Sequence, residues 1–505
     1  MSINTQSIID RHLYFLKSFS EAKTAIYEAD LSLFSLKQDW KRIYGNSFTG
    51  VHHFISETYL PSLLEVVDQK QTDIRIPKDF LLPSSIFLTL NSNLTFGSLI
   101  SWQVRSFFYA LLLVFKNFYI ILLLSFLRNM NLEGKTIIYG VKEVDLEDDS
   151  SVFNFRYFLN SMNFKKGETI HETDLFPYKS SRQTKRTEAE SSLQLPARVF
   201  FFLKSIYLLS KGCLGLLFGN KLTIVIASKL IKAEYLLTIC KDKRPKNVIY
   251  PIHSGFFIAP EIAILKKINV NLIAFEFSQS YFWSSLKPPN DSPALYSFYS
   301  MEENQNVNSR WPPTLLPSEI WAYDEFSKKS FQTFLNAKDN IKIKLVGSIN
   351  ISDSPKLSVP KNEADIAIFG VQDLKGPYEN FYANSDVLKK FYEDINETLK
   401  EKNIVSFVKA AKAEEKLKSS KVDLKNFDKF LLINNIAPRR LISEVNLVIC
   451  FPFTSPAFIA KNLNKSVIFY DPIGIVDDTL DFARDIPLIH GKESLSMFID
   501  RVIGV

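Results

Sequence analysis

Two hydroxyl side chains stand where a strand is predicted to give way to a helix. The apolar run Leu447–Phe451 is typical of a buried strand, and Pro452 lies in the turn that follows it. Thr454 and Ser455 are placed to cap the next helix, and Pro456 stands where a first-turn proline is favoured. Backbone N–H groups at a helix start, together with two hydroxyls, suit a phosphate. Ordinary capping by Thr or Ser is the alternative reading.

Three more residues could assist at such an anion site. Lys409 and Lys412 follow a predicted strand that begins at Ile404. A lysine at a strand end can neutralise a phosphate as a point charge, and a solvated lysine is the plainer reading. Gly370 ends another predicted strand, where it would permit close approach of a ligand or simply form a turn. There is no GxGxxG sequence, so no dinucleotide cofactor is expected.

Acid–base chemistry has its own candidates earlier in the chain. Glu276 ends a predicted strand, Asp148 lies in an acidic stretch, and His253 ends the strand that begins at Asn247. A carboxylate could serve as a general base or as a nucleophile, and the histidine could contact the same group. Arg156 could bind an acidic group of a ligand. The alternatives are a strand-end hydrogen bond for Glu276, a surface loop for Asp148, a satisfied loop histidine and a surface salt bridge.

Composition narrows the function classes. The 505 residues carry a net charge of +7, which is mild for this length, and no nucleic-acid-binding module is recognisable. The three cysteines form no CxxC pair, and the six histidines lack metal-ligand spacing, so no metal site is expected. The N-terminus lacks the order of a secretory signal, which predicts a reducing, cytoplasmic location.

The elements that would position these residues predict an α/β fold. Short apolar runs alternate with helical stretches in two blocks, typical of two parallel, doubly wound sheets that face a cleft. Ligands in such sheets sit at the carboxyl ends of the strands. We expect a helical region over 1–130, a first Rossmann-like domain over 131–351 and a second over 361–505. Residues 352–361 read as the linker, and an amphipathic helical segment is inserted at about 176–232.

Two apolar stretches raise the question of a membrane. Ser106–Leu127 is long enough to span a bilayer, but Lys116 and Asn117 stand at its centre. In Ala197–Leu230 basic residues recur at intervals, which resembles an interfacial helix. Three readings stay open: segments lying on the membrane, buried core helices, or at least one spanning helix.

The C-terminal block resembles a known family. A short helix begins at Pro438, Phe451-Pro452-Phe453-Thr454-Ser455-Pro456 follows the next strand, and Asp471-Pro472 ends the one after. This order resembles bacterial surface-polysaccharide biosynthesis proteins with a Pro-Phe-Thr-Ser motif and, distantly, GT-B transferases of sialic acid and Kdo. The resemblance implies a GT-B fold and a donor phosphate held by Thr454 and Ser455. It also compares Asp148 with the base of bacterial sialyltransferases, whereas Ala410 departs from the family's Lys-Pro or His-Pro pair.

The resemblance also implies a function. The expected activity is glycosyl transfer from a nucleotide-activated donor, such as a CMP-linked nonulosonate or Kdo, to a surface-polysaccharide or lipid-linked acceptor. The enzyme would work on the inner face of the cell membrane without a nucleic-acid partner. A nucleotide-sugar epimerase and a non-catalytic, membrane-bound assembly protein are the alternatives.

Overall fold

The computed structural model describes about half of the chain. The described residues are 95–126, 129–130, 132–141, 155–176, 190–191, 195–242, 244–252, 259–276, 317–322, 341–347, 364–371, 385–409, 422–433, 438–452, 454–476 and 486–504, with a few single positions besides. Asp148, His253 and Lys412 lie outside them, as do the predicted linker and most of the region before residue 95.

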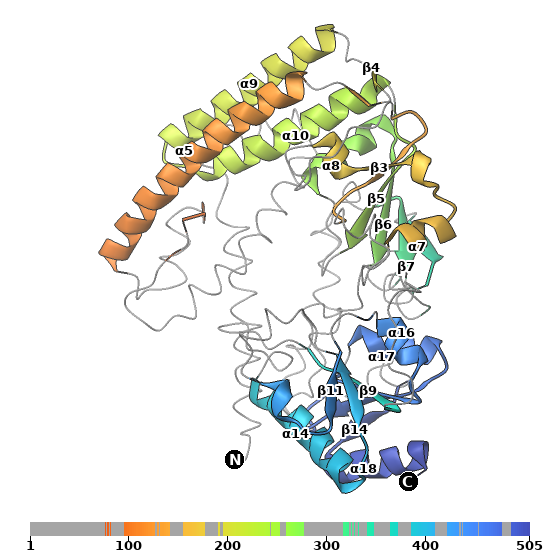
Figure 1. The fold of residues 1–505 in the computed structure, drawn as a ribbon. Helices are drawn as coiled ribbons and strands as arrows, with labels where there is room; N and C mark the ends of the chain where they lie inside the picture. Colours follow the sequence, from red (N-terminus) through yellow and green to blue (C-terminus); the bar gives the residue numbers. More distant parts are fainter. Residues whose placement is uncertain are drawn as a thin grey trace.

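The first sheet has six parallel strands (Figure 1). Its order is β3-β2-β5-β6-β7-β8. The chain adds β3 on one side of β2 and then crosses over to add β5 and the later strands on the other side. In a doubly wound sheet this reversal is the topological switch point, beside which ligands bind. The strands are β2 (Thr136–Ile138), β3 (Thr169–His171), β5 (Asn247–Ile252), β6 (Asn271–Glu276), β7 (Glu319–Ala322) and β8 (Lys342–Leu345).

Helices cover both faces of this sheet. On one face, α7 (Phe155–Ser161) packs its aromatic rings on the strands, and Phe155 stacks on Phe275 of β6 with ring centroids 4.7 Å apart. On the other face lie α8 (Glu172–Leu175), α10 (Leu222–Asp242), α11 (Pro260–Ala263) and the 3-10 helix η4 (Ile264–Ile268). Burial on both faces explains why the inner strands read as continuous apolar runs.

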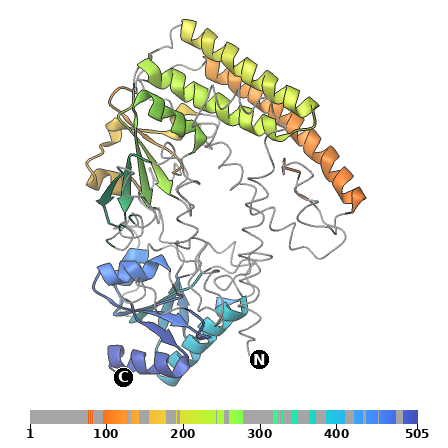
Figure 2. The ribbon, with the colours of Figure 1, turned by 180° about the vertical axis from the view of Figure 1, so that it is seen from behind.

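Two long helices extend this layer: α5 (Phe96–Phe126) and α9 (Leu195–Leu217) (Figure 2). Gly212 and Gly215 let α9 approach α10 closely, because a Cβ on Gly215 would meet Thr223 Cγ2 at 2.3 Å. Thr223 Oγ1 donates to Gly212 O at 2.8 Å across the same crossing. At the sheet end of the layer, β1 (Asn129–Met130) pairs antiparallel with β4 (Glu190–Ser191).

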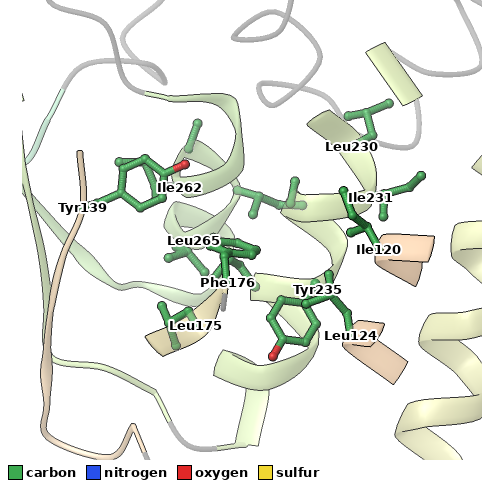
Figure 3. Packing of buried hydrophobic residues seen from close by; sticks show 14 of the residues in the cluster. Ile120, Leu124, Tyr139, Leu175, Phe176, Leu230, Ile231, Tyr235, Ile262 and Leu265 are labelled. Carbon is green, nitrogen blue, oxygen red and sulfur yellow. The ribbon is translucent and has the colours of Figure 1, made fainter. Parts of the chain in front are cut away.

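Helix α10 is the buried middle of this layer, which corrects one expectation from the sequence. Ala197–Leu230 is not a single interfacial helix, because the chain turns at Gly219, whose φ is +84°. Leu230, Ile231 and Tyr235 of α10 lie between α5 on one side and the helices over the sheet on the other (Figure 3). The second half of the predicted interfacial segment is therefore core.

Ion pairs fix the order of the layers. Lys204 of α9 lies 2.7 Å from the buried Glu234 of α10, and Lys229 of α10 lies 3.0 Å from the buried Glu261 of α11. An unpaired charge at these depths would be costly, so each pair selects one helix partner. Together they link α9 to α10 and α10 to the helix next to the first sheet.

The second sheet also has six parallel strands, in the order β11-β10-β9-β12-β13-β14. Numbered along the chain, this is the 3-2-1-4-5-6 order of the Rossmann fold, with its switch point between β9 and β12. The strands are β9 (Ile366–Phe369), β10 (Ser406–Lys409), β11 (Phe430–Leu432), β12 (Leu447–Cys450), β13 (Ser466–Asp471) and β14 (Leu488–His490).

Among the described residues, four α-helices flank the second sheet. Helices α14 (Ser385–Glu401) and α18 (Lys492–Ile503) lie together on one face, where Lys492 contacts Glu397 and Glu401 at 2.9 and 2.8 Å. Helices α16 (Pro438–Ser443) and α17 (Ser455–Asn462) lie on the other (Figure 1). In the core between α14 and the sheet, Tyr470 donates its hydroxyl to Asp394 at 2.7 Å.

The predicted fold class is confirmed: two parallel, doubly wound sheets in an α/β chain, preceded by a helical region of which α5 is the described part. The edge strands β3 and β14 were missed. Each has three residues and partly exposed side chains, so neither produces a continuous apolar run. The predicted domain limits stay a prediction.

Candidate functional site

The Pro-Phe-Thr-Ser turn lies at the switch point of the second sheet. Strand β12 pairs along its whole length with β9, and the amide of Phe451 donates to Phe369 O at 2.8 Å. The segments that leave β9 and β12 therefore begin side by side, Gly370 after one strand and Pro452 after the other. This edge is where ligands bind in open parallel sheets.

The hydroxyl of Thr454 has a different partner from the one expected. Thr454 is the N-cap residue of α17 by its backbone, but its Oγ1 donates to Phe451 O at 2.9 Å and caps no helix amide. Pro456 stands in the first turn as predicted, and Ala457 N is bonded to Thr454 O at 3.1 Å. Because proline has no N–H, this helix start offers fewer free amides than the sequence suggested. Thr454 Oγ1 can still accept a hydrogen bond.

Lys409 lies at the same edge, one strand further along. It ends β10 directly opposite Phe369 of β9. Burial lowers the pKa of its ammonium group to about 8, because a charged group loses hydration there. An anion bound nearby would favour the charged form and raise this pKa again. The position and the electrostatics of Lys409 both suit a phosphate contact at the switch point.

The close approach at Gly370 is made by a side chain of the protein. A Cβ on this residue would stand 1.8 Å from the hydroxyl oxygen of Tyr392, which comes from α14. Gly370 is thus required for packing at the sheet edge. Approach of a ligand to the same backbone stays a prediction.

Asp471 organises the next part of this edge. It ends β13 fully buried, and its carboxylate accepts hydrogen bonds from Ile473 N at 3.0 Å and Val476 N at 2.8 Å. His490 Nδ1 of β14 lies 3.3 Å from the same carboxylate. His490 was absent from the candidates because its strand was missed. In the sequence, the Asp471-Pro472 pair after a buried run already indicated the loop that this carboxylate holds.

The two other candidates that the structure describes, Glu276 and Arg156, lie in or beside the first sheet. Glu276 ends β6 and is almost fully buried, opposite Ile252 at the end of β5. Arg156 lies in the first turn of α7. The structure therefore groups Gly370, Lys409, Pro452, Thr454 and Ser455 at one sheet edge and places Glu276 at the carboxyl end of the other sheet.

His171, which sequence reasoning did not select, braces the switch point of the first sheet. It ends β3 and caps α8, where Thr173 N donates to its Nδ1 at 3.3 Å. The other ring nitrogen then carries the proton, and Nε2 donates to Val141 O at 2.7 Å. Val141 follows β2, so this imidazole holds the chain as it leaves the switch-point strand. The spacing of His171 and Asp174, which is that of a capping box at a helix start, is the sequence pattern that could have identified this residue.

Comparison of the chain with known protein families gives a match that includes the whole second sheet. Residues 276–499 match the family model described as "Polysaccharide biosynthesis PFTS motif protein". The predicted resemblance to PFTS-motif proteins is confirmed over this part of the chain. The matched residues include the PFTS turn, Lys409, Gly370 and, at their first position, Glu276.

Solved structures of enzymes bound to nucleotide sugars or nucleotides resemble this chain weakly. A UDP-GlcNAc 2-epimerase from Neisseria meningitidis bound to UDP-GlcNAc has a TM-score of 0.39 and 10% identity, over 73% of this chain and 91% of that one. The Methanocaldococcus jannaschii enzyme in complex with UDP-GlcNAc and UDP has a TM-score of 0.37 and 13% identity, over 74% of this chain and 93% of that one. Spinosyn rhamnosyltransferase SpnG complexed with thymidine diphosphate has a TM-score of 0.32 and 11% identity, over 73% of this chain and 91% of that one. No curated protein matches.

Proposed function

We propose that this protein is a glycosyltransferase that binds a nucleotide-activated sugar at the switch point of its second sheet. The observation that carries the proposal is the position of the PFTS turn beside the end of β9, one strand away from the partly buried ammonium group of Lys409. A turn with hydroxyls and a helix start, next to a lysine, suits a diphosphate or monophosphate leaving group.

The proposed reaction transfers the sugar to a hydroxyl of the acceptor. The acceptor oxygen forms a bond to the anomeric carbon, the bond from that carbon to the donor phosphate oxygen breaks, and the nucleotide leaves with the bonding electrons. Thr454, Ser455, Lys409 and Lys412 would hold the phosphate, with Pro452 and Gly370 shaping the turn. The hydroxyl proton passes to a base, for which buried Glu276 is the first candidate, ahead of Asp148 and His253.

The acceptor side completes the proposal. A surface-polysaccharide or lipid-linked glycan fits the family match, and a CMP-linked nonulosonate or Kdo is the donor that distant resemblance suggests. Arg156 would bind an acidic sugar. We also propose that the protein works at the cytoplasmic face of the cell membrane, where lipid-linked acceptors are found.

Nucleotide binding tests this proposal directly. Thermal unfolding is measured with CMP, UDP, GDP and TDP, and one of them should raise the Tm. Ser455→Ala should abolish most of that shift while leaving the unliganded Tm nearly unchanged, whereas Ser443→Ala, an exposed serine that ends the neighbouring helix α16, should keep the shift. Thr454→Ser, which retains the hydroxyl bonded to Phe451 O, should bind like the parent protein.

The measurement can also refute the proposal. If none of the four nucleotides shifts the Tm, or if Ser455→Ala keeps the full shift, the donor site does not lie at the PFTS turn. Incubation with the matching nucleotide sugar then separates two reactions. Release of nucleotide that depends on a glycan acceptor supports transfer, while an altered sugar still attached to the nucleotide indicates the epimerase.

A further inference from the structure

Helices α5 and α9 carry most of the large apolar side chains that the described part of the chain exposes. Of twenty such side chains, ten lie on α5 and seven on α9. Each helix is long and apolar enough to cross a membrane by length and composition, which is weak evidence alone because buried core helices share these properties. Their distribution around the helix axes says more.

The exposed side chains form one stripe along each helix. Spacings of three and four residues place them on a single face. On α5 they are Phe96, Ile100, Val104, Phe107, Phe108, Leu112, Phe115, Phe118, Tyr119 and Phe126, and on α9 they are Leu195, Val199, Phe200, Leu203, Tyr207, Leu214 and Leu217. We call these two stripes together the α5–α9 face.

The opposite side of each helix is already covered by protein. Trp102, Ala110, Ile120 and Leu124 of α5 are buried, and Ile120 and Leu124 point towards α10 (Figure 3). Phe201 and Leu208 are buried on α9. Both helices are therefore apolar on two faces, and the described part of the protein covers one of them. A contiguous exposed apolar surface of this kind marks an interaction site.

The charges on these helices indicate the chemistry of the partner. Neither α5 nor α9 contains an acidic residue, and their five basic residues are Arg105, Lys116, Arg198, Lys204 and Lys211. Lys116 is exposed beside Phe115, and the Lys211 ammonium group lies 5.6 Å from the ring centroid of Tyr207. Apolar and aromatic side chains mixed with basic ones match the boundary between acyl chains and anionic headgroups.

We propose that the α5–α9 face docks in the plane of a bilayer that contains anionic phospholipid. A spanning orientation would require apolar surface on all sides of the helix pair, but α10 covers the inner side and is tied by Lys229 and Glu261 to the helix next to the first sheet. In-plane docking immerses the stripes alone and leaves Lys116 at headgroup depth. The inference rests on the membrane location proposed above and is independent of the transferase chemistry.

Vesicle co-sedimentation of the full chain tests this. Vesicles of phosphatidylglycerol with phosphatidylethanolamine are compared with vesicles of phosphatidylcholine at low and high salt. The parent protein should pellet with the anionic vesicles, less at high salt. Leu112→Glu with Phe115→Glu, whose side chains are 64% and 71% exposed, should reduce the bound fraction at least tenfold. Met497→Glu is the matched control, since Met497 is 66% exposed on α18.

Further readouts make the result decisive. The double variant should keep its circular dichroism spectrum and its nucleotide-induced Tm shift, so loss of vesicle binding is separate from loss of the donor site. Alkaline carbonate should extract the bound protein, whereas resistance to carbonate would overturn in-plane docking in favour of a spanning helix. Three results would overturn the proposal. The parent protein stays in the supernatant with the anionic vesicles, the double variant binds them as well as the parent protein does, or the parent protein forms a dimer without vesicles that the double variant dissociates.

Discussion

The amide of Phe451 donates a hydrogen bond to the carbonyl of Phe369 at 2.8 Å, just where β12 and β9 end. This bond fixes the start of the PFTS turn beside Gly370. Lys409 pairs with Phe369 from the other side, so three segments far apart in sequence meet at one sheet edge. The predictions for the site depend on this arrangement.

Nucleotide affinity should fall as the pH rises through about 8. Burial lowers the pKa of Lys409 to about 8 in the nucleotide-free protein, and a bound phosphate would raise it by favouring the charged form. Above pH 8 binding must take up a proton, which costs about tenfold in affinity per pH unit. Isothermal titration calorimetry at pH 7, 8 and 9 measures this.

Two variants isolate the contribution of Lys409. Lys409→Arg should keep high affinity at pH 9, because the guanidinium stays charged, and Lys409→Met should bind weakly at every pH. A parent protein whose affinity does not change between pH 7 and 9 would show that this ammonium group does not contact the nucleotide.

Gly370→Ala should destabilise the second sheet. The added Cβ would stand 1.8 Å from the Tyr392 hydroxyl, and overpacking of this kind costs about 1–3 kcal/mol in the free energy of unfolding. Adding Tyr392→Phe removes the nearest atom and should recover part of the loss. Urea unfolding checks both variants, and Gly167→Ala, with nothing within 4 Å of its Cβ, serves as the control. Equal stability of Gly370→Ala and the parent protein would contradict the contact.

The α9–α10 crossing should be as sensitive to a single methyl group. Gly215→Ala places its Cβ 2.3 Å from Thr223 Cγ2 and forces the helices apart, at a cost of about 1–3 kcal/mol in unfolding free energy. Gly97→Ala, also helical but open on all sides, should stabilise by about 0.5–1 kcal/mol through helix propensity. Opposite signs in urea unfolding support the close crossing, and two stabilising substitutions would refute it.

The ion pair between Lys229 and Glu261 should make stability depend on acid pH. Burial by itself raises the pKa of the Glu261 carboxyl, but the charges of Lys229 and Lys232 and hydrogen bonds outweigh this and lower the pKa from 4.5 to about 2. The folded protein therefore binds fewer protons than the unfolded chain in this window. The stabilisation is complete above pH 4.5 and is lost as the pH falls towards 2.

Glu261→Gln tests this linkage. Removing one partner of a buried pair costs about 3–5 kcal/mol at neutral pH, and the difference from the parent protein should shrink as the pH falls below 4.5. Glu393→Gln breaks the exposed pair with Lys389, 3.5 Å apart, and should cost less than about 0.5 kcal/mol. A difference for Glu261→Gln that stays constant from pH 7 to 3 would count against the lowered pKa.

Much of the fold could be predicted because buried parallel strands leave a local pattern. Runs such as Leu272–Phe275 and Leu447–Cys450 are apolar on both faces, and each was recognised as a strand from the sequence. The edge strand Leu488–His490 is covered on fewer sides and carries no such pattern. Its existence is decided by pairing with a neighbour.

The sequence by itself determined the two α/β units, the turn at Phe451–Pro456 and the apolar character of α5 and α9, because strand burial, proline position and hydropathy are local properties. Only the tertiary structure decided that α10 is core while α5 and α9 keep an exposed stripe, and that the Thr454 hydroxyl bonds back to Phe451 O. Which face of an apolar helix is covered, and which partner a hydroxyl selects, depend on residues that chain folding brings together from distant positions.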